Sequence, residues 1–154
     1  MIVASSADMS WLRVLEHHAV RTPDAPLAVF EGRTVTYADM ARWAARLAAG
    51  LHRAGVGAGD VVALLSYNST EFLATIFAAN HVGATAMPIN WRLAAPELRY
   101  LLEHSQARAL VCDEALVDLA DEATSDLGDG DLGDGLLKVC VSSADLPGWK
   151  RFSR

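Results

Sequence analysis

Residues 80–113, NHVGATAMPINWRLAAPELRYLLEHSQARALVCD, constrain the fold of this chain more than any other stretch. They hold the end of a helix, an apolar run over 84–89, a polar corner, a helix with Pro96 in its first turn and a second apolar run over 107–112. Proline suits a first helical turn because the N–H that it lacks has no partner there. Two buried strands joined by a helix predict a right-handed crossover and parallel pairing.

The same alternation continues on both sides of this segment. A strand over 61–65 precedes a helix over 70–82, and a helix over 114–125 precedes a strand over 136–141. Upstream, a helix from Ser10 to Arg21 is followed by two short β-favouring runs that flank a Glu-Gly-Arg turn. We therefore predict an α/β fold, with helices on both faces of a mostly parallel sheet and a short N-terminal β-hairpin.

The expected organisation has three parts. Residues 1–9 form an N-terminal tail, residues 10–141 form an α/β subdomain, and residues 142–154 form a polar tail that pairs with no other element. Within the subdomain, Thr36 and Asp39 have the spacing of a capping box, and Ser69 is placed to cap the next helix. That helix, over 70–82, is apolar nearly all round, which predicts burial on more than one side, in this domain or against another.

The composition excludes several classes of protein. The chain has 154 residues, 52% hydrophobic and 21% charged, which favours one folded domain over a disordered chain. It has no uncharged apolar run of the roughly 18 residues that a membrane span needs. The net charge of -6 argues against a nucleic-acid partner, because such proteins need an excess of Lys and Arg. Without a secretion signal, and with Cys112 and Cys140 inside apolar runs, a cytoplasmic protein with two buried reduced thiols is expected.

The polar corner is the main candidate for a functional site. The apolar run that ends at Ile89 gives way to Asn90, Trp91 and Arg92, at the carboxyl end of a predicted strand. Open α/β sheets bind their ligands at that end. The Arg92 guanidinium suits phosphate recognition, although a surface ion pair with Glu97 explains it equally well from spacing alone. Trp91 is equally compatible with a pocket wall and with the edge of the core.

Other polar groups have plainer interpretations. Three arginines, Arg42, Arg46 and Arg53, share one side of a helix over 37–54 and suit a weak contact with an anionic membrane surface, but a solvated helix face is favoured. Asn68 follows a strand, where asparagine commonly bonds to its own backbone. The glycine-rich stretch over 55–60 ends a helix and leads into a strand, the reverse of a dinucleotide-binding loop.

No complete catalytic or metal site is recognisable in the sequence. The duplicated DLGDG over 126–135 lacks the spacing of a calcium loop, so a solvated surface loop is expected. The five histidines have no ligand spacing, and no serine lies in a nucleophile elbow. We therefore expect no metal site and no catalytic residue within this chain.

A family resemblance is carried by two strings in register. Residues 67–113, YNSTEFLATIFAANHVGATAMPINWRLAAPELRYLLEHSQARALVCD, resemble the N-terminal subdomain of the adenylate-forming, or AMP-binding, enzymes, and among them the acyl-CoA synthetases. Residues 22–64, TPDAPLAVFEGRTVTYADMARWAARLAAGLHRAGVGAGDVVAL, continue the pattern upstream. The Pro-Ile-Asn-Trp-Arg-Leu string favours fatty-acid and aryl acid CoA ligases over peptide-synthetase adenylation domains.

The resemblance implies a chemistry. These enzymes use ATP and Mg²⁺ to convert a carboxylic acid to an acyl-adenylate, and they then pass the acyl group to the thiol of CoA. A fatty acid is the substrate class that the resemblance suggests for this chain. It also implies that Arg92 contacts the phosphates of CoA, whereas Asn90 is implied only as a neighbour that shapes the corner.

The resemblance also implies an incomplete enzyme. The family's phosphate loop, its later nucleotide motifs and its C-terminal lysine have no counterpart up to Arg154. We expect an N-terminal fragment of a larger adenylate-forming fold that is inactive alone, binds no cofactor tightly and has the remainder of its own enzyme as its partner. A non-catalytic binding module, another kind of adenylate-forming enzyme, a homodimer and peripheral membrane contact stay open as alternatives.

Overall fold

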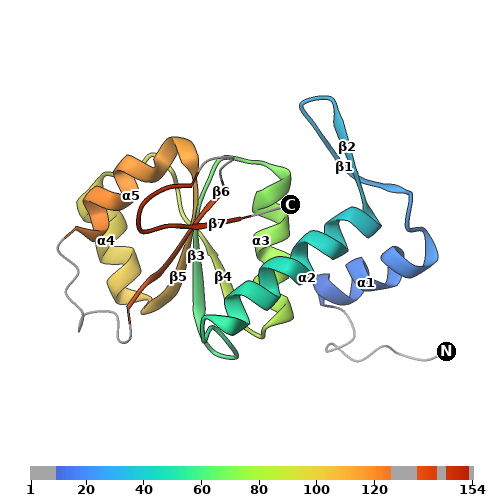
Figure 1. The fold of residues 1–154 in the computed structure, drawn as a ribbon, viewed down its shortest axis with the longest axis horizontal. Coiled ribbons are helices and arrows are strands. Elements are labelled where there is room, and N and C mark those ends of the chain that lie inside the picture. Colours follow the sequence, from blue (N-terminus) through green and yellow to red (C-terminus); the bar gives the residue numbers. More distant parts are fainter. Residues whose placement is uncertain (1–9, 126–134, 142–144, 153–154) are drawn as a thin grey trace.

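The central element of the fold is a five-stranded sheet with the strand order β4-β3-β5-β6-β7 (Figure 1). The structure is a computed structural model that describes residues 10–125, 135–141 and 145–152. All four strand pairings in this sheet are parallel. Its strands are β3 (Val61–Leu65), β4 (Thr85–Pro88), β5 (Ala107–Asp113), β6 (Leu137–Val141) and β7 (Lys150–Arg151). The predicted fold class is confirmed.

Helices cover both faces of the sheet because its strands alternate between two apolar cores. In β3, Val62 and Leu64 join one core, while Ala63 and Leu65 join the other. The first core is covered by α2 (Tyr37–Arg53) and α3 (Thr70–His81), and the second by α4 (Ala95–His104), η2 (Glu114–Leu116) and α5 (Val117–Thr124). Strands buried on both faces read as continuous apolar runs, which is why the sequence locates them well.

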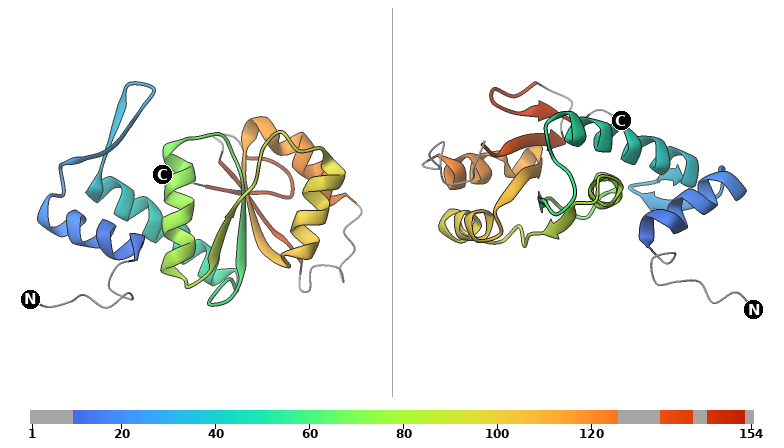
Figure 2. Two further views of the ribbon diagram at one scale, coloured as in Figure 1. Left: turned by 180° about the vertical axis from the view of Figure 1, so that it is seen from behind. Right: turned by 90° about the horizontal axis from the view of Figure 1, so that it is seen from below.

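The N-terminal elements form one end of the molecule (Figure 2). Helix α1 (Trp11–Arg21) begins at Ser10, whose Oγ accepts a hydrogen bond from the N–H of Arg13 at 3.2 Å. Strands β1 (Pro26–Phe30) and β2 (Arg33–Thr36) form an antiparallel hairpin. The expected capping box then starts α2, because Thr36 Oγ1 accepts from the N–H of Asp39 and the Asp39 carboxylate accepts from the N–H of Thr36.

Helix α3 is buried on more than one side, as its composition predicts. It contacts α1, α2, β3 and β4 within this chain. Six of its residues, Glu71, Ala74, Thr75, Phe77, Ala78 and Ala79, are at most 6% exposed. Its apolar character is therefore explained largely by packing inside the described part of the chain.

The prediction of a polar tail without a partner element is wrong for residues 145–152. Strand β7 pairs in parallel with β6, and the residues on either side of it, Trp149 and Phe152, are buried in opposite cores. The Trp149 indole N–H also donates to the Asp121 carboxylate at 3.1 Å. Strand β7 has only two exposed cations between two aromatic residues. This pattern is too short to show the period of a strand, so the sequence does not predict β7.

The structure does not test two further predictions, the acidic surface loop and the subdomain boundaries. Apart from Gly135, the acidic duplicated loop lies outside the described residues, and the subdomain boundaries at residues 9 and 141 otherwise stay a prediction. Of the helices that the structure describes, none combines the length and the apolar character needed to cross a bilayer.

Candidate functional site

The polar corner, Asn90 to Leu93, begins where β4 stops pairing with β3. The Ile89 N–H still donates to the Leu64 carbonyl at 2.9 Å, so the two strands stay paired up to the corner. The Asn90 side-chain oxygen then accepts from the N–H of Arg92 at 3.1 Å, and the Asn90 carbonyl accepts from the N–H of Leu93 at 3.2 Å. Asparagine thus supplies the local hydrogen bonds that turn the chain, a common use of this residue in turns.

An aromatic and cationic stack covers this corner. Tyr67, which follows β3, packs edge-to-face on Trp91, with 5.0 Å between the ring centres. The Arg92 guanidinium lies over the Trp91 ring, 4.1 Å from its centroid, within the range of a cation–π contact. Trp91 also packs against the core under α4, so it covers the core edge and holds the arginine. The stack leaves Arg92 exposed to solvent.

The alternative ion pair between Arg92 and Glu97 does not form in this structure. The Glu97 carboxylate instead accepts a hydrogen bond from the N–H of Ala94 at 2.8 Å, at the start of α4. An acidic side chain in a first helical turn is favoured by the free N–H groups and the dipole there. Arg92 is therefore held by an aromatic ring, which leaves its N–H groups available to a ligand.

The strand order adds a second feature to this edge of the sheet. The chain moves from β3 to β4 on one side and then returns to place β5 on the other side of β3. Open α/β sheets bind ligands at such a switch point, outside the carboxyl ends of the strands. At this edge of the sheet, Ser66 and Tyr67 follow β3, with the exposed Asn68 next to them, and Asp113 ends β5. The sequence did not show the switch point or the Tyr67–Trp91 contact because both depend on strand order.

The three arginines of α2 do not act as one group. The Arg42 guanidinium pairs with the Asp39 carboxylate one turn earlier. The hydrogen bonds from Thr36, together with Arg42, hold the pKa of Asp39 below its ordinary value. Arg46 and Arg53 instead line a cavity of about 470 Å³ together with Lys150 and Arg151, which lie in the segment predicted to be a polar tail.

The two cysteines are adjacent but chemically quiet. Cys112 and Cys140 lie in register on the neighbouring strands β5 and β6, and both thiols are free and buried. Burial raises the pKa of Cys140 to about 11, and it raises the pKa of Cys112 further. Since the thiolate is the reactive form, neither side chain is a nucleophile near neutral pH in this fold. In the described ranges, no three or more His, Cys, Asp or Glu side chains gather as metal ligands.

The fold and the corner define a doubly wound α/β subdomain with its polar site at the carboxyl edge of the sheet. Comparison with protein families matches residues 15–149 to the family described as AMP-binding enzyme. Because this match takes in most of the chain, the protein belongs to the AMP-binding enzyme family. The predicted resemblance to the N-terminal portion of the adenylate-forming enzymes is confirmed.

The relatives of this chain include acid–CoA ligases. It is 39% identical over 137 residues to an indoleacetate–CoA ligase of Aromatoleum aromaticum, a match that covers 88% of this chain and 25% of the ligase. A Rhodopseudomonas palustris structure assigned as a long-chain-fatty-acid CoA ligase superposes with a TM-score of 0.82 and 29% identity, covering 96% of this chain and 36% of that one. The chain thus spans about a quarter to a third of the length of these relatives.

A shorter relative also matches. An uncharacterized protein of Mycobacterium tuberculosis is 36% identical over 102 residues, which cover 65% of this chain and 58% of that protein. More than half of that relative therefore lies within the matched region.

Proposed function

We propose that this chain forms the N-terminal subdomain of an ATP-dependent acid–CoA ligase. The intact enzyme would convert a carboxylic acid, ATP and CoA to acyl-CoA, AMP and pyrophosphate through an acyl-adenylate, with Mg²⁺ as the metal. A fatty acid is the proposed substrate class, and the cytoplasm is the proposed location. The observation that carries this proposal is the match of nearly the whole chain, fold and sequence together, to the N-terminal part of acid–CoA ligases.

Within that enzyme, we propose that Arg92 contacts the phosphates of CoA. Support comes from its place at the carboxyl edge of the sheet and from its exposed guanidinium, which Trp91 holds at 4.1 Å. An arginine fork donates paired hydrogen bonds to phosphate oxygens, and a stacked arginine loses little freedom when it does so. Asn90 and Trp91 then act as positioning residues, since they shape the turn and hold the guanidinium.

The isolated chain is proposed to be inactive and to bind ATP, Mg²⁺ and CoA weakly at most. The carboxyl edge of the sheet supplies one wall of a site, and the remaining walls of a ligase would come from the rest of the polypeptide. That remainder is the proposed partner. Association into a homodimer and peripheral contact with a membrane also remain proposals.

The test compares two proteins made from the same gene: the 154-residue chain and the longest reading frame that contains it. Each is assayed for ATP–pyrophosphate exchange and for thioester formation from decanoate, ATP and CoA. We expect both activities from the longer protein and neither from the chain. Exchange without thioester formation would favour another adenylate-forming enzyme, and the absence of both activities would refute the assignment as a fatty-acid CoA ligase.

The second candidate is a non-catalytic binding or interaction module. It is favoured by the Mycobacterium tuberculosis relative, in which the matched region takes up 58% of the protein. Size-exclusion chromatography and thermal unfolding of the 154-residue chain separate the two candidates. A monomer that unfolds cooperatively and exposes little apolar surface supports the module, whereas aggregation supports a part of a larger protein.

A further inference from the structure

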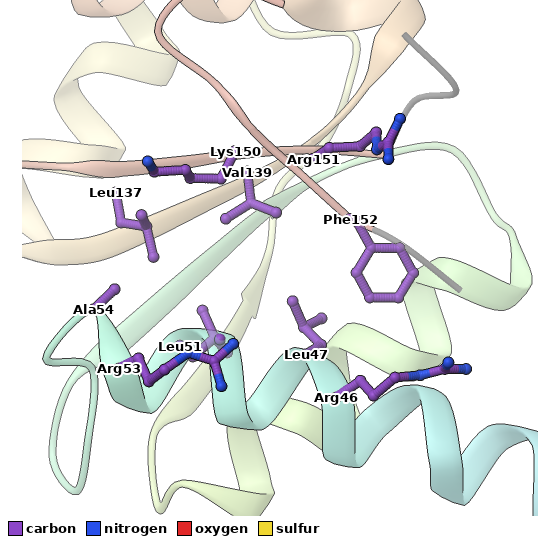
Figure 3. Close-up of a pocket in the computed structure, with 11 residues that line it drawn as sticks. Arg46, Leu47, Leu51, Arg53, Ala54, Leu137, Val139, Lys150, Arg151 and Phe152 are labelled. Atoms are coloured by element: carbon purple, nitrogen blue, oxygen red, sulfur yellow. The ribbon is translucent and has the colours of Figure 1, made fainter. Parts of the chain in front are cut away.

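A cavity with an apolar wall lies between α2 and the strands β6 and β7, apart from the polar corner (Figure 3). Its volume is about 470 Å³, within the roughly 300–1,000 Å³ of small-molecule sites. Leu47 and Leu51 of α2 face Val139 of β6 and Phe152 across it. These four side chains are at most 7% exposed, so they form a packed and preformed floor. Ala54 and Leu137, which also line the cavity, are more exposed.

Four cations surround this apolar wall. Arg46 and Arg53 lie on the helix side, and Lys150 and Arg151 lie on the strand side (Figure 3). The residues that line the cavity include no acid. Arg151 has an ion pair with Asp145 at 3.7 Å, but the Asp145 side chain is 91% exposed, so that pair is weak. Four of the 13 Lys and Arg residues of an acidic chain thus line one cavity, and this local excess of positive charge favours an anionic ligand.

Gly50 is a further feature of the cavity. It lies inside α2 and lines the cavity, and glycine is among the least favourable residues in a helix interior. A Cβ atom at this position would meet no atom within 4 Å, so packing within the described chain does not require a glycine. The missing side chain instead keeps the cavity open between Leu47, Leu51 and the two arginines.

We propose that this cavity binds an amphiphilic anion, a small molecule with an apolar body and a carboxylate or phosphate head. The apolar body packs on Ala54 and Leu137, over the floor formed by Leu47, Leu51, Val139 and Phe152. The head accepts charge-assisted hydrogen bonds from the surrounding guanidinium and ammonium groups, of which the arginine forks suit carboxylate and phosphate alike. None of these residues belongs to the polar corner, so the proposal stands or falls separately from the ligase assignment.

The 154-residue chain, labelled in its Leu and Val methyl groups, is titrated by NMR with decanoate, decyl phosphate, decanol and inorganic phosphate, each below its micellar concentration. We expect saturable shifts of the Leu47, Leu51 and Val139 methyl signals with decanoate or decyl phosphate. Decanol, which lacks the charge, and inorganic phosphate, which lacks the apolar body, should bind at least tenfold more weakly. Comparison of the two anions identifies the preferred head group.

Two kinds of variant test the assignment to this cavity. Arg46→Gln and Arg53→Gln should each raise the Kd of the preferred anion about tenfold, since each removes a charge-assisted contact. Arg42→Gln is the matched control, because Arg42 is on the same helix but pairs with Asp39 outside the cavity. Gly50→Leu should fill the cavity and abolish binding while it raises the melting temperature, so a lost fold cannot explain the result.

Several outcomes would overturn the proposal. Decanol that binds as tightly as decanoate would show that the cations play no part. Methyl shifts confined to Leu98 and Leu102, on the opposite face of the sheet, would place the ligand elsewhere. Undiminished binding by the Gly50→Leu variant, or no saturable binding of either anion, would show that this cavity does not bind an amphiphilic anion.

Discussion

Arg92 is the residue on which the proposed chemistry depends most directly. In the intact ligase, Arg92→Ala should raise the KM for CoA about tenfold or more, because a guanidinium that bonds a phosphate contributes the energy of a charge-assisted hydrogen bond. ATP–pyrophosphate exchange, which reports adenylate formation, should change much less. The measurement is the pair of half-reactions in parallel.

The matched control for this variant is Arg92→Lys, which keeps the charge but loses the fork and the flat stacking surface on Trp91. It should recover part of the CoA affinity. An equal loss in both half-reactions for Arg92→Ala would contradict a selective contact with CoA.

The cysteines allow a prediction about pH. Because burial raises the pKa of Cys140 from its ordinary 9.0 to about 11, and that of Cys112 further, unfolding releases thiol protons above about pH 9. The unfolded state then binds fewer protons than the native state, so the free energy of unfolding should fall as the pH rises from about 9 through 11. It should be independent of these thiols below pH 9.

Urea unfolding across this pH range measures the effect. Lysines and tyrosines also titrate there, so the comparison is with a Cys112→Ala, Cys140→Ala double variant, which should show a shallower decline. Rapid alkylation of the native thiols by iodoacetamide at pH 7 would show that the thiols are not protected by burial.

At the scale of the element, the clearest constraint is the close approach of two turns. Gly83 follows α3 with φ at +77°, and a Cβ there would lie 3.2 Å from the Cβ and 3.3 Å from the Cα of Ala58. The Gly59 N–H also bonds to the Gly83 carbonyl at 3.2 Å, so the two turns are held together. Gly83→Ala should therefore lower the free energy of unfolding by about 1–3 kcal/mol, through left-handed strain and overpacking.

Gly57 provides the matched control for this prediction. It lies in the neighbouring turn without a positive φ, and a Cβ there would meet nothing within 4 Å. Gly57→Ala should leave the chemical denaturation midpoint almost unchanged. Similar midpoints for the two variants would mean that the two turns can move apart without a loss of stability.

Most elements were predictable because each carries a local signal. The cap residues Ser10, Thr36 and Ser69 locate three helix starts, and continuous apolar runs locate β3 and β5. Strand β7 was not predictable, because two exposed residues between two aromatic ones have no period to detect. It pairs with the edge of β6, and the aromatic residues on either side of it pack in the two cores.

The candidate site was predictable only in part, because some of its contacts depend on how the strands are ordered in the whole molecule. The place of Arg92 at a strand end follows from local sequence, but its contact with Trp91 and the contact of Trp91 with Tyr67 require β3 and β4 to be neighbours. The cationic cavity likewise joins α2 to a strand about a hundred residues later. Such contacts depend on strand order. Strand order is determined by the packing of all the elements together and not by any single segment of sequence.

The stability of the whole molecule should depend on the C-terminal aromatic pair, although the sequence shows it as part of a polar tail. Trp149 is 8% exposed and Phe152 is 6% exposed, and they close the two cores at the β7 edge of the sheet. The Trp149 indole bonds to Asp121, which also pairs with Lys138 at 2.7 Å, so α5, β6 and the approach to β7 are linked. Trp149→Ala or Phe152→Ala should each cost about 3–5 kcal/mol, the usual range for a buried aromatic residue.

Urea unfolding monitored by circular dichroism measures this loss, with Lys150→Gln as the control within the same strand. Lys150 is exposed, so its replacement should shift the unfolding free energy by less than about 0.5 kcal/mol. A cost below about 1 kcal/mol for both aromatic variants would mean that β7 is not part of the cooperative unit. A large cost would extend that unit to residue 152, eleven positions beyond the subdomain end that the sequence predicts at residue 141.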